Sequence, residues 1–231
     1  MDQELKGNRI WELDFFRGVA LLLMIYFHVI FDMKDIFNYN INYSTGINYF
    51  LGKISALLFI FISGISSHLS KSNTKRGLRL LGIALVITLA THLYSAGLGI
   101  KFGILHFLAI CMLLAPMFKK MNIYLLLILA TAIIAIGNYF SGFTLPQDFL
   151  FVFGLISSNF VSSDYYPLLP WMGIFLYGMA AGQALYSKKR SIFSFSIGDN
   201  PISKAGRHTL LYYLIHQPVI IVILTLINRY K

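Results

Sequence analysis

Long apolar segments separated by short polar ones run through the whole 231-residue chain. A transmembrane helix needs about 20 predominantly apolar residues, and seven segments approach that length. They cover residues 11–33, 47–67, 78–95, 102–118, 123–140, 168–186 and 209–228. This pattern predicts an all-α, polytopic membrane helix bundle of about seven transmembrane helices, forming a single domain over residues 1–231. Residues 149–156 are apolar but too short to span, and fit a re-entrant or interfacial segment or part of an outer loop.

The basic residues between these segments indicate how the chain crosses the bilayer. There are 19 Lys and Arg residues against 9 Asp and Glu residues. If the N-terminus lies in the cytoplasm and the C-terminus outside, every cytoplasmic piece carries at least two bases and the long outer loop 141–166 carries none. That distribution follows the positive-inside rule. We therefore expect a multi-pass integral membrane protein, in the cytoplasmic membrane if the source is prokaryotic.

The amino-acid composition excludes a soluble domain and limits the classes of partner that the chain can bind. Hydrophobic residues make up 57% of the chain and charged residues 12%, against about 25% charged in soluble proteins. The formal charge of +10 follows the loops, so it indicates topology and no nucleic-acid partner. The single cysteine, Cys111, allows no intramolecular disulfide. Gly178 and Gly182 form a small-residue face that serves either helix packing within the monomer or a homodimer.

Ionisable side chains inside a transmembrane helix are costly and are functional candidates. The first segment carries Asp14 and Arg17, three residues apart and able to pair on one helix face. Arg17 and His28 are eleven residues apart, which puts them on one face with about 16 Å between them along the axis. Asp32 lies four residues after His28 and is expected to orient its ring.

Each of these groups also has a purely structural explanation. Arg17 can reach the cytoplasmic interface while paired with Asp14. Asp32 lies near the outer end of the segment, where water can solvate it, and His28 can be a hydrogen-bonded core histidine. The combination of all four on one helix favours function over these separate explanations.

Later segments supply further polar candidates. His106 lies early in the fourth segment, at a depth expected to match that of His28. His216 and Gln217 precede Pro218 in the last segment, and their position predicts an inner depth near that of Arg17. Trp171 marks an interface at the entrance to the sixth segment. Arg79 is one of several cytoplasmic bases that could bind anionic lipid or a phosphorylated cofactor, and nothing in the spacing favours a metal.

Four short motifs resemble one known family, and they are spread over essentially the whole chain. They are Asp-x-x-Arg-Gly at 14–18, Phe-Gly-Ile-Leu-His at 102–106, Asp-Tyr-Tyr-Pro-Leu-Leu-Pro-Trp at 164–171, and Gly-Arg-His-Thr-Leu followed by Tyr-Leu-Ile-His-Gln-Pro within 206–218. Together they resemble prokaryotic relatives of the catalytic domain of heparan-α-glucosaminide N-acetyltransferase. The spacing from Arg17 to His28 is also similar to the signature of the broader transmembrane acyltransferase superfamily.

The resemblance implies transfer of an acetyl or other acyl group from cytoplasmic acyl-CoA to a sugar, lipid-linked or other acceptor that offers an amine or a hydroxyl. It also implies that Arg17 and His28 are needed for activity. In the resulting hypothesis His28 is the general base or the transiently acylated nucleophile, and Asp32 orients it. Arg17, supported by Asp14, holds the pantetheine or polarises the carbonyl.

The remaining candidates line the path of donor or acceptor; they are His106, His216, Gln217, Trp171 and Arg79. Two other functions compete with acyl transfer. A proton-coupled transporter uses the same intramembrane His, Asp and Arg groups as a relay, although the chain lacks the internal repeat typical of transporters. A non-catalytic membrane scaffold would be indifferent to loss of His28.

Overall fold

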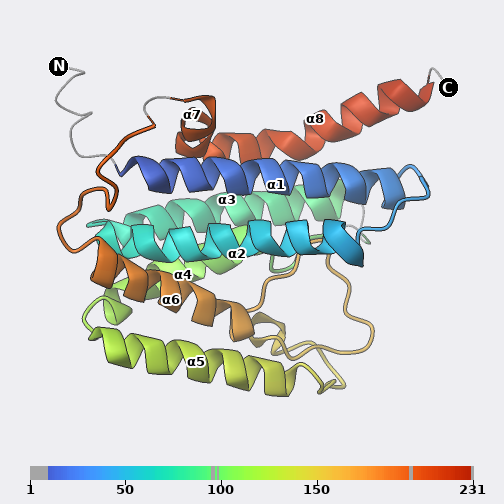
Figure 1. The fold of residues 1–231 in the computed structure, drawn as a ribbon. Helices are drawn as coiled ribbons and strands as arrows, with labels where there is room; N and C mark the ends of the chain where they lie inside the picture. The colour runs from blue at the N-terminus through green and yellow to red at the C-terminus, as the bar shows by residue number, and fades with distance from the viewer. Residues whose placement is uncertain (1–9, 95–96, 98, 198–199, 230–231) are drawn as a thin grey trace. The chain divides into compact units, whose positions relative to one another are not determined.

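The computed structural model describes residues 10–94, 97, 99–197 and 200–229. Within these ranges the regular structure is helical, with the short 3₁₀ turn η3 (Phe151–Phe153) and two isolated β-bridges (Figure 1). The helices are α1 (Trp11–Asp35), α2 (Gly46–Leu69), α3 (Asn73–Tyr94), α4 (Ile104–Phe118), α5 (Ile123–Phe140), α6 (Leu168–Leu185), α7 (Pro201–Arg207) and α8 (Thr209–Arg229). The predicted all-α class is confirmed.

Six of these helices, α1, α2, α3, α5, α6 and α8, are long and apolar enough to cross a membrane. The apolar helix α4 has 15 residues, which at 1.5 Å per residue is about 22 Å and so shorter than the hydrocarbon core of about 30 Å. The protein is a multi-pass integral membrane protein. The number of seven spans and the orientation with the N-terminus inside stay predictions.

Helix α4 begins two residues later than the apolar run predicts. Phe102 forms an isolated bridge with Tyr165, and the Asp164 carboxylate accepts a hydrogen bond from the Ile104 amide at 2.9 Å. A Cβ on Gly103 would collide with that same carboxylate. Since the chain before Ile104 is held by the segment ahead of α6, the helix starts at Ile104.

The described helices group into two compact units. The first consists of the described parts of Met1–Ile62 and Lys188–Lys231, and the second is Ser63–Ser187, so that α2 contributes to both. The prediction of a single domain over 1–231 remains a prediction.

In the first unit, α7 lies against the opening turns of α1 with almost no side chains between the two backbones. A Cβ on Gly18 would collide with the Ile202 carbonyl, and a Cβ on Gly206 would collide with the Asp14 carbonyl. Because α7 occupies this part of α1, α8 runs alongside its later turns (Figure 1). On another face of α1, the Ser55 hydroxyl of α2 donates to the Ala20 carbonyl at 2.9 Å.

Helix α7 was not predicted, because seven residues are too few for a periodic hydrophobic pattern. A local signal is nevertheless present in the sequence. The Asn200 side chain accepts a hydrogen bond from the Ser203 amide at 2.8 Å, and Pro201 takes the first helical position. Asparagine followed by proline is typical of a helix start.

In the second unit, α5 packs on α6 and α3 packs on α4. The glycines of α6 bring it close to the last turns of α2, where a Cβ on Gly64 would meet Gly178 at 3.0 Å and one on Gly182 would meet the Ile65 carbonyl at 3.1 Å. The small-residue face of Gly178 and Gly182 therefore packs within the monomer, while the homodimer stays a prediction. Residues 149–156 contain the short turn η3 and an isolated bridge from Ile156 to Thr144, and Phe149 is 84% exposed.

Candidate functional site

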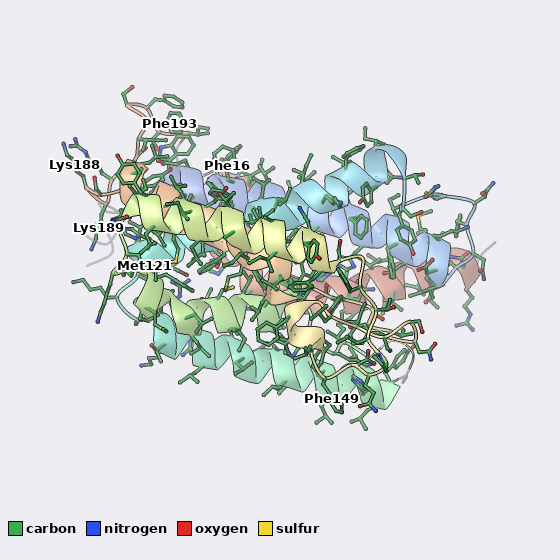
Figure 2. All side chains as sticks on the ribbon, turned by 90° about the horizontal axis from the view of Figure 1, so that it is seen from below. Phe16, Met121, Phe149, Lys188, Lys189 and Phe193 are labelled. Atoms are coloured by element: carbon green, nitrogen blue, oxygen red, sulfur yellow. The ribbon has the colours of Figure 1, made fainter. Side chains whose placement is uncertain are left out.

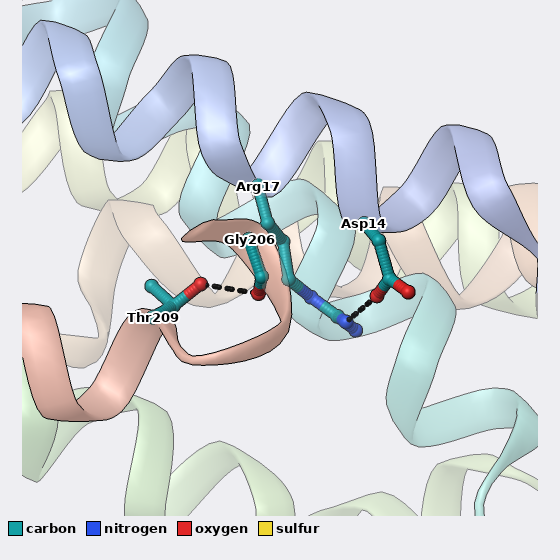
Figure 3. Close-up of polar contacts among 4 residues, drawn as sticks. All are labelled: Asp14, Arg17, Gly206 and Thr209. Atoms are coloured by element: carbon teal, nitrogen blue, oxygen red, sulfur yellow. Dashed lines mark hydrogen bonds and ion pairs between the residues drawn. The ribbon is translucent and has the colours of Figure 1, made fainter. Parts of the chain in front are cut away.

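The pair predicted at the start of α1 is present. An Arg17 Nη1 donates to Asp14 Oδ1 at 3.1 Å, one helical turn apart (Figure 3). Both side chains are largely shielded, with 27% and 13% exposed respectively. The contact fixes the direction of the guanidinium, as the spacing of three residues indicates.

The junction between α7 and α8 lies beside this pair. Figure 3 shows Gly206 and Thr209 next to the Arg17 side chain, and the Thr209 hydroxyl donates to the Gly206 carbonyl at 2.6 Å. That bond satisfies a carbonyl at the end of α7, which has no partner within its own helix. The close packing of Gly206 on Asp14 thus places the last span next to Arg17.

His28 and His216 are neighbours, although 188 positions separate them in the chain. Their ring centroids are 4.8 Å apart, with an interplanar angle of 64°. The expectation that His216 lies at the depth of Arg17 was wrong. Because α7 takes the opening turns of α1, α8 begins further along α1 and brings His216 to His28.

The hydrogen bond of His216 assigns its neutral tautomer. Nδ1 lies 2.6 Å from the Tyr213 carbonyl oxygen, which can only accept, so Nδ1 carries the hydrogen and Nε2 keeps a lone pair. Within the described part of the chain, His216 Nε2 and His28 Nδ1 are buried and have no hydrogen-bond partner. Each of the two adjacent rings thus has a buried nitrogen with no hydrogen-bond partner among the described residues. An imidazole nitrogen without a partner is free to take part in proton transfer.

Asp32 and Gln217 complete the cluster between α1 and α8. Asp32 is 0% exposed, and Gln217 Nε2 lies 2.8 Å from each of its carboxylate oxygens. Buried polar groups need such partners because desolvation without one is costly. Asp32 therefore joins the two helices beside the histidine pair, and its role in orienting His28 stays a prediction.

The other candidates belong to the second unit. His106 is buried at the start of α4, with Nε2 3.0 Å from the Thr88 hydroxyl on α3. Since that hydroxyl donates to the Ile100 carbonyl at 2.8 Å, it accepts from His106 Nε2. His106 Nδ1 then keeps the lone pair, and it has no partner among the described residues.

Trp171 and Arg79 are less closely held by neighbouring groups than His106 is. The Trp171 ring contacts that of Tyr166 at 5.0 Å between centroids, at the start of α6, where an interface was expected. Arg79 is exposed on α3. Their roles toward a substrate or cofactor stay predictions.

Sequence reasoning did not identify three groups that hold the candidates in place: Thr88, Asp164 and the Tyr213 carbonyl. Asp164 was noted only as part of a motif. The motif offered a signal, because an acidic side chain ahead of a proline-rich helix entrance can accept backbone hydrogens. Thr88 and Tyr213 gave none, since their contacts depend on helix packing and on a main-chain oxygen.

Fold and site together define a multi-pass membrane protein with a buried histidine, carboxylate and amide cluster between its first and last long helices. A family model described as "Heparan-alpha-glucosaminide N-acetyltransferase, catalytic" matches residues 9–218, and every candidate residue lies within that range. The chain belongs to this family, which implies a membrane acyltransferase and confirms the resemblance seen in the motifs. No curated protein and no solved structure matched the chain.

Proposed function

We propose that this protein transfers an acetyl or other acyl group from cytoplasmic acyl-CoA to an amine or hydroxyl of a sugar or another acceptor. The observation that carries the proposal is the pair of adjacent rings, His28 and His216, with their centroids 4.8 Å apart. Each has a ring nitrogen without a partner among the described residues. Histidine is the usual base for activating such acceptors near neutral pH.

In the proposed reaction, one histidine removes the proton from the acceptor as its nitrogen or oxygen attacks the thioester carbonyl. The bond from acceptor to carbonyl forms, the carbon–sulfur bond breaks, and the CoA thiolate leaves and takes up a proton. We assign the role of base to His28, because the family resemblance implies that it is needed for activity. His216 is the second candidate for that role, because its Nδ1–H is fixed on the Tyr213 carbonyl and its lone pair lies on Nε2.

Arg17 serves the donor at a distance from the reacting carbon. Eleven residues of helix separate it from His28, about 16 Å along the axis, which exceeds the length of an arginine side chain. If His28 is the base, this separation favours the pantetheine or phosphate part of acyl-CoA as the partner of Arg17. The Asp14 carboxylate, 3.1 Å from Nη1, would keep the guanidinium pointed at that partner.

Proton-coupled transport is the rival function, because buried His and Asp groups within spans also form proton relays. The two proposals differ in one requirement. Acyl transfer consumes acyl-CoA and releases a free thiol, whereas transport leaves acyl-CoA unchanged and moves protons across the bilayer.

The test is release of CoA thiol from acetyl-CoA by purified protein in liposomes, with and without a panel of amino sugars and lipid-linked sugars. We expect His28→Ala to lower the rate by about 10²–10⁴-fold, the usual contribution of a general base. His208→Ala, which removes an exposed histidine of the same unit, is the matched control. Wild-type protein that neither binds acetyl-CoA nor releases thiol, while it carries protons into vesicles, would establish the rival.

The kinetics also separate the two roles open to His28. An acyl-histidine intermediate releases CoA before the acceptor binds, and gives parallel double-reciprocal lines when both substrates are varied. Direct transfer needs both substrates bound at once, and gives intersecting lines.

A further inference from the structure

The segment 188–197, between α6 and α7, combines charge and exposed apolar side chains in an unusual order. Three consecutive bases, Lys188, Lys189 and Arg190, are followed by apolar residues interspersed with serines. The apolar members are Ile192, Phe193, Phe195 and Ile197. We call residues 188–197 the basic aromatic loop.

The loop is attached to the first turn of α1. Glu12, which is 1% exposed, accepts a hydrogen bond from the Ile192 amide at 3.0 Å. The Trp11 indole donates to the Phe195 carbonyl at 3.1 Å, and its ring lies 5.7 Å from the rings of both Phe193 and Phe195. These contacts hold the loop against the start of α1, with the rings of Phe193 and Phe195 beside Trp11.

The apolar side chains of the loop stay partly exposed to the surroundings of the protein. The four apolar members of the loop are between 41% and 58% exposed, and Phe16, on the next turn of α1, is 43% exposed. Figure 2 shows Phe16 and Phe193 at the same end of α1 as Lys188 and Lys189. A contiguous apolar patch rimmed by charge is typical of a protein or membrane contact.

The position of the loop favours the membrane over another protein as its binding partner. Trp11 begins α1, a helix long and apolar enough to span, so the loop lies where that helix leaves the hydrocarbon. Aromatic rings favour this boundary, and basic side chains beside it are attracted to anionic headgroups. Topology alone explains three bases in a cytoplasmic loop, but it does not explain four apolar side chains left exposed next to them.

We propose that the basic aromatic loop binds the headgroups of anionic phospholipids, with its aromatic rings inserted at the boundary of the acyl chains. This site is independent of the acyl transfer proposed above. The position of the connection between α6 and α7, and through it that of α7, would then depend on the content of anionic lipid in the membrane.

The two tryptophans of the chain allow a direct test. The variant Trp171→Phe leaves Trp11 as the only indole, and Trp11 touches the loop. The protein is reconstituted in vesicles of phosphatidylcholine and phosphatidylglycerol at a fixed ratio, with brominated chains on one lipid or the other, and quenching of Trp11 is measured. We expect brominated phosphatidylglycerol to quench Trp11 more strongly than brominated phosphatidylcholine does at the same mole fraction.

Neutralising the bases should remove this excess quenching. The triple variant Lys188→Gln, Lys189→Gln and Arg190→Gln is compared with the double variant Lys71→Gln and Lys75→Gln. Lys71 lies between α2 and α3 and Lys75 in the first turn of α3; both are exposed, and their loss should keep the excess. Salt at 1 M, where the Debye length is about 3 Å, should also reduce it. Equal quenching by both lipids, or an excess that survives the triple variant, would overturn the proposal.

A pair of substitutions at Glu12 checks that attachment of the loop matters. Glu12→Gln keeps an oxygen for the Ile192 amide and should retain the excess quenching, whereas Glu12→Ala removes that acceptor and should lower it. Free CoA is added to vesicles of pure phosphatidylcholine as the last arm. A change in Trp11 emission there, without any preference for phosphatidylglycerol, would make the loop a site for a soluble phosphate ligand and overturn the lipid proposal.

Discussion

Replacing Gln217 by leucine tests whether the contact between α1 and α8 stabilises the first unit. Gln217 Nε2 lies 2.8 Å from both oxygens of Asp32, which is 0% exposed. Leucine has a similar volume but no donor, so the substitution keeps the packing and leaves the carboxyl group without its amide partner.

The expected loss follows from the cost of an unsatisfied buried acceptor. We expect Gln217→Leu to lower the free energy of unfolding by about 2 kcal/mol, within the range for hydrogen bonds to charged groups and for buried groups left unpaired. The measurement is equilibrium unfolding in mixed micelles, followed by Trp11 fluorescence in the Trp171→Phe background. Gln217→Leu should also reduce acyl transfer, because the same contact positions α8 and His216.

A double-mutant cycle separates the hydrogen bond from a general defect. Asp32→Asn should cost less in the Gln217→Leu background than in the wild type, since the interaction is already lost there, and the coupling energy should be about 0.5–3 kcal/mol. Full additivity of the two substitutions, or unchanged stability of Gln217→Leu, would refute the inference that this contact holds the helices together.

Two further predictions concern the packing of α7 and the loop between α5 and α6. Gly18→Ala forces a Cβ against the Ile202 carbonyl, and this overpacking should cost about 1–3 kcal/mol and lower the thermal midpoint; Gly82→Ala, whose Cβ meets nothing within 4 Å, should leave the midpoint unlowered. Hydrogen bonds from Ser157 lower the pKa of Asp148 below its ordinary value of 3.8, so their stabilisation is present above that value and is lost as pH falls through the lowered pKa. Exchange of the Ser157 amide, corrected for its intrinsic pH dependence, should therefore accelerate at low pH in the wild type; the same pH response in Asp148→Asn would contradict this assignment.

Local patterns predicted the parts of the fold that depend on near neighbours in the chain. Apolar length alone placed α1 and α5 to within two residues, because a helix in a bilayer must satisfy its own backbone hydrogen bonds. The Asp14–Arg17 contact followed from the three-residue spacing, since positions one turn apart share a face. The family could also be recognised from the sequence, because its motifs are short runs of residues that keep their order along the chain.

The centre of the candidate site could not be obtained in this way. His28 and His216 are far apart in the chain, as are Asp32 and Gln217, and spacing along one helix says nothing about contacts with another. The deciding element was α7, which the hydrophobic pattern did not reveal and which displaces α8 along α1. The sequence alone determined the class of protein, the apolar helices and the residue types available for chemistry. Only tertiary packing decided which of those residues meet, because glycine contacts between α1 and α7 set the position of the last helix.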